Sequence, residues 1–111
     1  MYRARKRRRI CSIPSNNKYG PLGVKNKDYI NMTLDEYETI RLIDYEGFNQ
    51  ENCALQMNVA RTTVQGIYAS AREKIAKSLI TGKILLIEGG NYQISDHNKK
   101  RRCGMGCSKH T

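Results

Sequence analysis

The sequence predicts a mainly α fold, in which a three-helix helix-turn-helix core carries a C-terminal β-hairpin and basic, flexible termini. Apolar residues recur at helical spacing on both sides of a short turn near residue 58. Two apolar runs flank a pair of glycines at residues 89–90. All 10 acidic residues lie between Asp28 and Asp96, whereas 14 of the 20 Lys and Arg residues lie outside that segment. The predicted segments are a basic, loop-rich arm over 1–27, a folded domain over 28–96, and a basic tail with Cys and His over 97–111.

The first helix is expected to run from about Leu34 to about Glu46, after a short extended piece over residues 29–32. Thr33 stands at the N-cap position, and Glu36 follows three residues later, which is the spacing of a capping box. Gly47 supplies the left-handed residue that often closes a helix. The apolar stripe of this helix consists of Leu34, Tyr37, Ile40 and Ile43.

A second, short helix is expected over residues 50–57, with Asn49 as its N-cap. Asn58 comes next, and asparagine tolerates a left-handed turn position better than most other residues with a side chain. A third helix starts near Arg61 and ends at Gly82. Two helices joined by a turn of three or four residues form a helix-turn-helix. The inner face of the third helix is predicted to consist of Val64, Ile67, Ala71, Ile75 and Leu79.

The outer face of the third helix begins with polar side chains. In a helix-turn-helix, the second helix of the motif presents its N-terminal residues to base edges in the major groove. Arg61 can bond guanine in a bidentate manner, and Gln65 can bond adenine in the same way. Basic residues further along the helix suit backbone phosphates. The alternative is an ordinary helical hairpin whose polar face meets water. The residues expected to contact DNA are Arg61, Thr62, Thr63, Gln65, Gly66, Ala69, Arg72, Lys74 and Lys77.

The apolar runs around Gly89 and Gly90 predict a β-hairpin, with strands at about 83–87 and 92–95. Three roles are open to such a hairpin. It can brace the long helix, which is the simplest role, act as a wing near DNA, or pair with another subunit.

The net charge of +10 predicts a polyanionic partner, most simply nucleic acid, although a charged surface also aids solubility. Runs of like charge at both ends are typical of arms that bind nucleic acid. No apolar stretch of the length of a secretory signal follows the basic start, and no aliphatic run is long enough to span a membrane, so we expect a cytoplasmic protein. The basic arms are formed by Arg3, Arg5, Lys6, Arg7, Arg8, Arg9, Lys99, Lys100, Arg101 and Arg102.

Several motifs carry a resemblance to a known family. They are RKRRRICSIP near the start, YGPLG, LDEYETIRLIDYEG, MNVARTTVQGIYASAREKIA and IEGGNY. In their order and spacing the chain resembles the bacterial and archaeal proteins grouped as domain of unknown function 134. Its helix-turn-helix is also similar, more loosely, to region four of sigma-70 factors. The resemblance implies transcriptional regulation through double-stranded DNA, with RNA polymerase as a further partner.

The sequence departs from the family pattern at two positions. Ala60 stands where the family usually has a serine cap, and Gly66 stands where it commonly has arginine. A missing cap side chain weakens a helix start by about 1 kcal/mol. Glycine inside a helix costs about 0.5–1 kcal/mol relative to alanine. Both departures lower the expected affinity for DNA, and the expected fold is unchanged.

The cysteines of the two basic flanks suggest a metal site. Two of them stand in the tail with three residues between them, and the glycines among these let a loop fold around an ion. The family tends to carry cysteines in both flanks. Tetrahedral zinc or an iron–sulfur cluster accepts such ligands. The alternative is a flexible tail with free thiols, and Cys53 is expected to be a core or partly buried thiol. The candidate ligands are Cys11, Cys103, Cys107 and His110.

No converging set of acid, base and nucleophile groups is visible, so we do not expect an enzyme. Three functions remain. The first is a DNA-binding regulator, for which a homodimer is one arrangement, because two-fold proteins read paired half-sites. The second is an RNA-binding module that uses the basic arms. The third is a protein-interaction module in which the acidic first helix docks on a basic partner.

Overall fold

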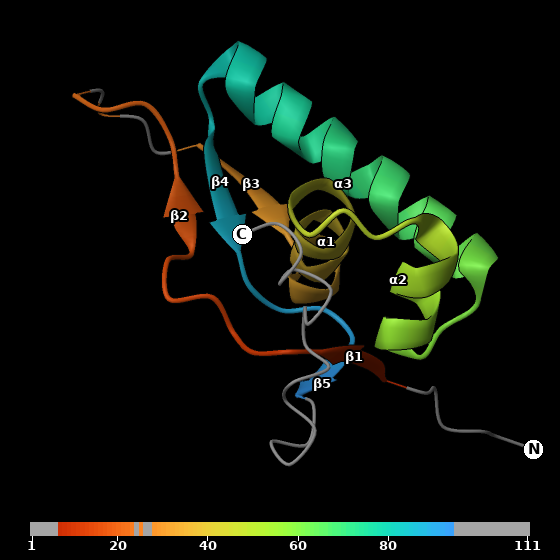
Figure 1. The fold of residues 1–111 in the computed structure, drawn as a ribbon. Helices are drawn as coiled ribbons and strands as arrows, with labels where there is room; N and C mark the ends of the chain where they lie inside the picture. The colour runs from red at the N-terminus through yellow and green to blue at the C-terminus, as the bar shows by residue number, and fades with distance from the viewer. Residues whose placement is uncertain (1–6, 24, 26–27, 95–111) are drawn as a thin grey trace, which may run out of the picture.

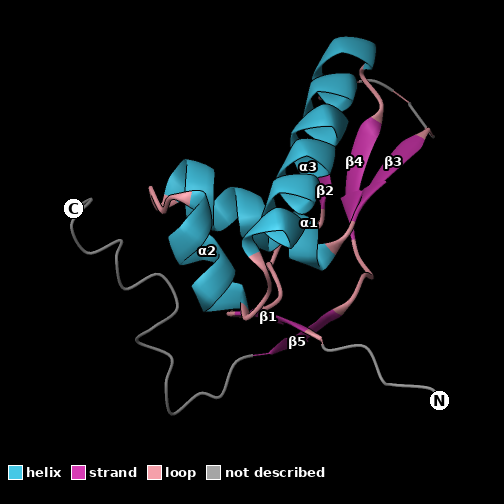
Figure 2. Ribbon diagram, turned by 90° about the vertical axis from the view of Figure 1, so that its right-hand side faces the viewer, coloured by secondary structure: helices cyan, strands magenta, loops and turns pink. Residues whose placement is uncertain are grey.

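The computed structural model describes residues 7–23, 25 and 28–94 (Figure 1). Strands from both ends of the chain lie beside a helical middle, and the long helix α3 runs across the molecule (Figures 1 and 2). In chain order the elements are β1 (Arg8–Ile10), β2 (Lys18–Tyr19), β3 (Tyr29–Met32), α1 (Leu34–Ile40), the π-helix η1 (Arg41–Tyr45), α2 (Gln50–Met57), α3 (Arg61–Thr81), β4 (Ile84–Ile87) and β5 (Tyr92–Ile94).

The predicted mainly α class is wrong, because the described residues also form a three-stranded sheet and a two-stranded sheet. In the larger sheet, β4 is the central strand, antiparallel to β2 and parallel to β3. In the smaller sheet, β1 and β5 are parallel, with Arg8 opposite Tyr92 and Ile10 opposite Ile94. Both sheets therefore join strands that are far apart in the sequence. The fold is a mixture of α-helices and β-sheets.

The predicted C-terminal hairpin is also wrong, since β4 and β5 lie in different sheets. Gly89 and Gly90 both have positive φ, but they carry the chain from one sheet to the other. The carbonyl of Gly89 accepts from the N–H of Leu34 at 2.8 Å, which ties this loop to the start of α1. A Cβ on Gly90 would lie 2.5 Å from Asp35 Oδ1 and 2.6 Å from Thr33 Cβ. The glycine pair thus serves close packing against α1 and not a tight turn.

The predicted flexible N-terminal arm is wrong for residues 8–10 and 18–19, which are the strands β1 and β2. Ile10, at the end of β1, is 1% exposed and belongs to the core. The basic start of the chain is therefore part of the fold from Arg8 onward. The C-terminal tail lies outside the described residues.

The first helix begins as predicted. Thr33 Oγ1 accepts from the N–H of Glu36 at 3.4 Å, and Glu36 Oε1 accepts from the N–H of Thr33 at 3.0 Å. The helix ends in the wider turns of η1, in which the N–H of Glu46 donates to the carbonyl of Arg41 five residues earlier. Leu42, which the predicted stripe omits, is fully buried in this segment.

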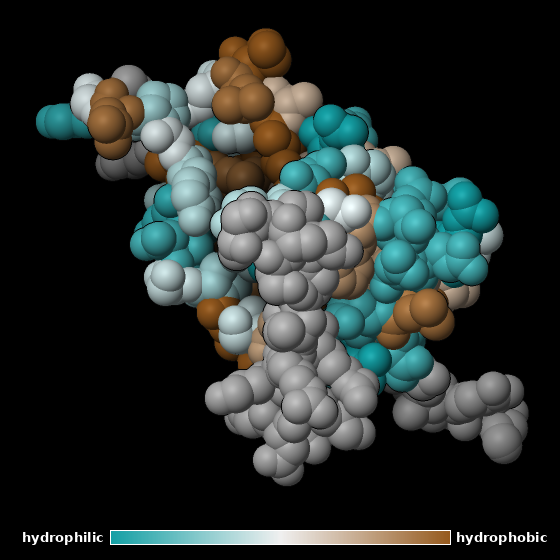
Figure 3. Space-filling model, in the orientation of Figure 1, coloured by the Kyte–Doolittle hydropathy of each residue, from teal (hydrophilic) through white to brown (hydrophobic). Residues whose placement is uncertain are grey.

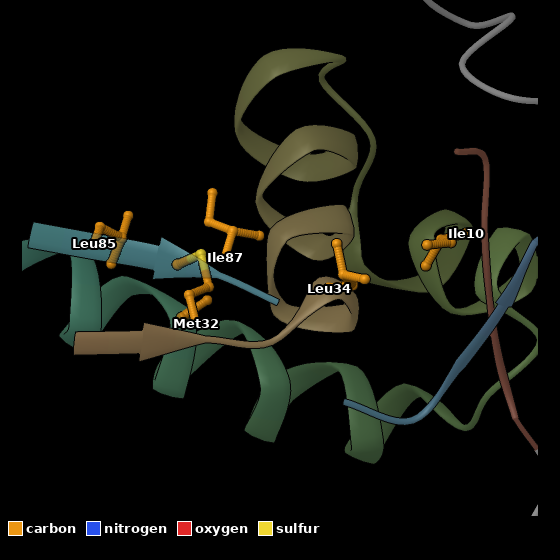
Figure 4. Packing of buried hydrophobic residues seen from close by; sticks show 6 residues of the cluster. Ile10, Met32, Leu34, Leu85 and Ile87 are labelled. Atoms are coloured by element: carbon orange, nitrogen blue, oxygen red, sulfur yellow. The ribbon is translucent and has the colours of Figure 1, made fainter. Parts of the chain in front are cut away.

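Two hydrophobic clusters hold the described residues together, and α3 contributes to both. One lies between the sheets, α1 and α3, and Figure 4 labels its side chains on β1, β3, α1 and β4. The other joins η1, α2 and the start of α3. Its Cys53 is fully buried, as predicted, and burial raises the pKa of that thiol to about 12. The members are Ile10, Met32, Leu34, Ala71, Leu85 and Ile87 in the first, and Leu42, Cys53, Ala54, Met57 and Val64 in the second.

Candidate nucleic-acid interface

The turn between α2 and α3 determines where the outer face of α3 begins. Asn58 adopts the left-handed conformation with φ 60° and ψ 48°, as predicted. Its N–H donates to the carbonyl of Leu55 at 3.2 Å, and the N–H of Val59 donates to that of Ala54 at 3.0 Å. These bonds satisfy carbonyls at the end of α2. Val59 packs against the cluster around Leu42, so the corner is held from inside.

The inner face of α3 is buried at the predicted positions Val64, Ile67 and Ala71. Val64 packs with residues of α2 and η1, whereas Ala71 packs with the cluster between the sheets and α1. Because the inner side is fixed at both places, the orientation of the opposite side is fixed as well.

The outer side of α3 is open to solvent over its first turns. Residues three and four apart share one side of a helix, so the polar start of α3 forms a continuous strip. Gln65, on which the predicted readout depends, lies in this strip and not in the core. Thr63 is half-buried beside it. We call the exposed strip the reading face; its members are Arg61, Thr62, Gln65, Gly66 and Ala69.

Two small residues affect how firmly the reading face is held. Ala60 is the N-cap of α3 and makes no side-chain hydrogen bond there. Gly66 lies in the middle of the strip, and a Cβ at this position would meet no atom within 4 Å. The missing Gly66 side chain leaves room for another molecule to approach the helix backbone.

We expect Ala60→Ser to raise the free energy of unfolding by about 0.5–2 kcal/mol, because the serine hydroxyl would accept from an N–H of the first turn of α3. Urea unfolding of both proteins, followed by far-ultraviolet circular dichroism, measures the change. Glu51→Ser, at an exposed site inside α2, is the control and should give no gain. A stability equal to that of the original chain would show that this helix start needs no cap.

Arg72 lies near one edge of the reading face and is held by a neighbouring side chain. Its Nη1 donates to the Tyr68 hydroxyl at 3.0 Å, and its guanidinium lies 5.3 Å from the centre of that ring. The Tyr68 hydroxyl in turn donates to Asp44 Oδ1 at 2.7 Å, and this bond raises the pKa of Tyr68. Arg72 remains exposed, so it can still reach a phosphate.

Lys74 is turned away from the reading face and bonds Glu36 Oε1 at 2.8 Å. The Ser70 hydroxyl donates to the other oxygen of Glu36 at 2.6 Å. Burial acts to raise the pKa of Glu36, but the bonds from Lys74, Ser70 and the N–H of Thr33 outweigh it and lower that pKa. Lys74 therefore joins α3 to α1. Lys77, one turn further along, is exposed.

The described part of the N-terminal arm makes structural contacts. Arg8 Nη1 donates to Asp35 Oδ2 at 2.6 Å. Arg9 Nε donates to the carbonyl of Gln56 at 2.9 Å, near the C-terminus of α2, where a positive charge is favoured. Arg7 is exposed. The predicted arm residues outside the described part are Arg3, Arg5, Lys6, Lys99, Lys100, Arg101 and Arg102.

A polar groove of about 540 Å³ runs along one side of the reading face. One wall is α3 from Thr62 to Ser70, and the other is formed by the start of α1, the loop between β4 and β5, and Arg8 of β1. Sequence reasoning missed Ser70 and Asn91, which belong to this groove. Ser70 follows Gly66 by four residues, and this helical spacing could have placed it beside the reading face. No local sequence signal could have placed Asn91 there. The side chains that offer hydrogen bonds are Arg8, Thr33, Thr62, Thr63, Ser70 and Asn91.

The carboxylates of α1 are not on its surface, whereas Asp44 in η1 is exposed. Asp35, Glu36 and Glu38 are 3%, 7% and 1% exposed. Each binds a basic side chain, and Glu38 accepts from Arg41 Nε at 2.9 Å and from Arg41 Nη2 at 2.8 Å. The exposed acidic helix face on which the protein-interaction alternative depends is therefore missing from this segment.

Of the four candidate metal ligands, the structure describes Cys11. Its sulfur accepts from Arg41 Nη2 at 2.9 Å, and its N–H donates to Glu38 Oε2 at 3.2 Å. Within the described residues, no group of three or more His, Cys, Asp or Glu residues could hold a metal ion. The predicted zinc or iron–sulfur site stays a prediction, because the other three ligands, Cys103, Cys107 and His110, lie outside those residues.

Comparison with known proteins identifies the family to which the sequence belongs. A model of the family described as "Protein of unknown function DUF134" matches residues 1–95. The chain belongs to the DUF134 family. A UPF0251 protein of Desulfitobacterium hafniense strain Y51 is 55% identical over 111 residues, which cover 98% of this chain and 88% of that protein. A UPF0251 protein of Halothermothrix orenii is 45% identical over 94% of this chain and 79% of its own length.

The DUF134 match confirms the resemblance read from the motifs. No solved structure matches the chain, so its likeness to region four of sigma-70 factors stays a prediction. Among the described residues of this DUF134 protein, none of the helices is long and apolar enough to cross a membrane.

Proposed function

We propose that this DUF134 protein is a cytoplasmic transcriptional regulator that binds double-stranded DNA with the N-terminal half of α3 in the major groove. The observation that carries the proposal is the orientation of α3. Its inner side is anchored at Val64, Ile67 and Ala71, while the reading face is open to solvent. A helix-turn-helix needs this arrangement to place side chains on base edges.

The reading face has two side chains that can distinguish base pairs. Arg61 can donate two hydrogen bonds to guanine, and Gln65 can bond both edge atoms of adenine. Gly66 and Ala69 on the same strip are small, which allows the helix backbone to sit close to the bases. Because two side chains of the reading face are suited to reading bases, each copy of the chain is expected to recognise a short sequence.

The groove beside the reading face suits a sugar–phosphate strand. Hydroxyl groups, an amide and a guanidinium line it, and these are groups that commonly bond phosphate oxygens. The carboxylates of Asp35 and Glu36 line it as well, and each is paired with a basic side chain. Lys77 and Arg72 are exposed on α3 and can contact the backbone on either side. The flanking arms add positive charge that lies outside the helix-turn-helix. The contact with RNA polymerase is part of the proposal through the resemblance to sigma region four alone.

Lys77→Ala is expected to weaken binding to every duplex by a similar factor, because a phosphate contact carries no sequence information. The slope of the logarithm of affinity against that of salt concentration should fall by about 0.9 for the lost contact. Fluorescence anisotropy with two unrelated duplexes at several salt concentrations measures both quantities. Lys25→Ala, at an exposed loop position, is the matched control. A loss confined to one sequence, or no change of slope, would contradict a phosphate role for Lys77.

A further inference from the structure

The C-terminal end of α3 carries large apolar side chains that nothing in the described part of the chain covers. Leu79 was predicted to extend the buried face, but it is 78% exposed, and Ile80 is 85% exposed. Leu22, in the loop after β2, is 95% exposed. This loop lies against the end of α3, because a Cβ on Gly82 would be 3.8 Å from Pro21. Contiguous exposed apolar surface of this kind marks an interaction site.

One of these side chains, Leu79, lines an apolar groove of about 590 Å³ between β2, β3, β4, α1 and the last turns of α3. Figure 3 shows hydrophobic residues gathered around this recess at the upper end of the molecule. None of the residues that line the groove has a charged side chain, although the whole chain has 20 Lys and Arg residues. The lining residues that the argument uses are Tyr19, Tyr37, Ile40, Ile75, Leu79 and Leu85.

The chemistry of the groove excludes the nearest alternative occupants. A nucleic acid needs positive charge, which the lining lacks. The chain's own residues 95–111 have five Lys and Arg but a single large aliphatic side chain, Met105. Burial of such a segment in an apolar groove would remove charges from water without pairing them. The occupant must instead present several large apolar side chains next to one another.

We infer that the occupant is a second copy of this chain, so that the apolar end of α3 forms a two-fold dimer interface. A two-fold interface must be self-complementary. The patch meets this requirement because it contains both protruding side chains, Leu22, Leu79 and Ile80, and a groove that can receive them.

The area is that of a small interface, which predicts a weak dimer that forms at high protein concentration. Complete burial of one large aliphatic side chain removes roughly 100 Å² of apolar surface from water. Three protruding side chains on each of two copies, with part of Tyr19 and the exposed surface of the groove, give roughly 1,000 Å². Stable interfaces bury about 1,200–2,000 Å² in total.

The position of the patch leaves the reading face free. Gln65 and Ile80 are 15 residues apart on α3, which is about 22 Å along the helix axis. Two copies joined at this end therefore hold their reading faces far enough apart to reach half-sites separated by one turn of DNA, about 34–36 Å. This half-site arrangement rests on the proposed function, whereas the dimer itself does not.

The test is the oligomeric state of the full chain without DNA, measured by sedimentation velocity under reducing conditions over a range of about 1–200 µM. The wild-type chain is expected to be a dimer at the upper end of that range. Leu79→Gln combined with Ile80→Gln should raise the dimer dissociation constant about 100-fold, since both side chains leave the interface. Leu55→Gln is the matched control, because Leu55 is 70% exposed on α2 and lies outside the patch.

The substituted positions are exposed, so circular dichroism should show an intact fold. A wild-type chain that stays monomeric throughout, or a double variant with an unchanged dissociation constant, would overturn the inference. The double variant should still bind a single half-site, whereas Gln65→Ala should leave the dimer intact. A wild-type chain that binds DNA but stays monomeric would contradict this inference alone. A wild-type chain that forms the dimer but binds no DNA would contradict the proposed function alone.

Discussion

Arg41→Met is expected to lower the free energy of unfolding by about 3–5 kcal/mol, because it leaves a buried carboxylate without its charged partner. The Arg41 guanidinium donates to both oxygens of Glu38 and, at 3.1 Å, to Glu46 Oε2. Glu38 is 1% exposed, so water cannot replace the lost hydrogen bonds. The same guanidinium reaches the sulfur of Cys11 and thus joins η1 to the segment after β1.

Urea unfolding monitored by circular dichroism measures this loss. Arg72→Met is the matched control, since Arg72 is an exposed arginine whose partners are a tyrosine hydroxyl and ring. It should change the stability by less than about 0.5 kcal/mol. Adding Glu38→Gln to Arg41→Met should recover part of the loss, because the buried charge is then removed. Equal stability of Arg41→Met and the original chain would mean that the network does not hold the fold.

Arg61→Ala combined with Gln65→Ala is expected to weaken binding to the preferred duplex by about 2–6 kcal/mol, since each bidentate base contact contributes about 1–3 kcal/mol of discrimination. Binding to an unrelated duplex should change much less, because phosphate contacts supply most of it. The variant should also be as stable as the original chain, since both side chains are exposed. Fluorescence anisotropy with the two duplexes at fixed salt measures the difference.

A control for this pair is Thr81→Ala combined with Lys25→Ala, which changes exposed residues away from the reading face. Equal losses on preferred and unrelated duplexes would contradict base reading and leave a purely electrostatic contact. Under the RNA-binding alternative, in which the basic arms carry the contact, the Arg61 and Gln65 changes should have little effect on any nucleic acid.

Local signals predicted the helical part of this fold well. The capping pair Thr33 and Glu36, the left-handed Asn58 and the closing Gly82 each act within a few residues, so their sequence spacing is sufficient. The burial of Val64 and the exposure of Gln65 follow from helical periodicity alone. The orientation of the reading face could therefore be predicted from the sequence.

The sheets could not be predicted from local sequence patterns, because the paired strands are far apart in the chain. β4 follows a long helix, yet it pairs with β2 and β3 from the start of the sequence. A local reading could pair β4 only with its nearest apolar neighbour across Gly89 and Gly90, which gave the wrong hairpin. The burial of Asp35 and Glu36 has the same origin, since their partners Arg8 and Lys74 are 27 and 38 residues away.

The most direct test of the DNA-binding proposal is a selection of bound sequences from random duplex oligonucleotides, performed in parallel with the original chain and Gln65→Ala. The proposal predicts a recovered consensus for the original chain and a loss of preference at one base pair of each half-site for the variant. Recovery of no consensus by the original chain, with no more selectivity than polylysine shows, would contradict it.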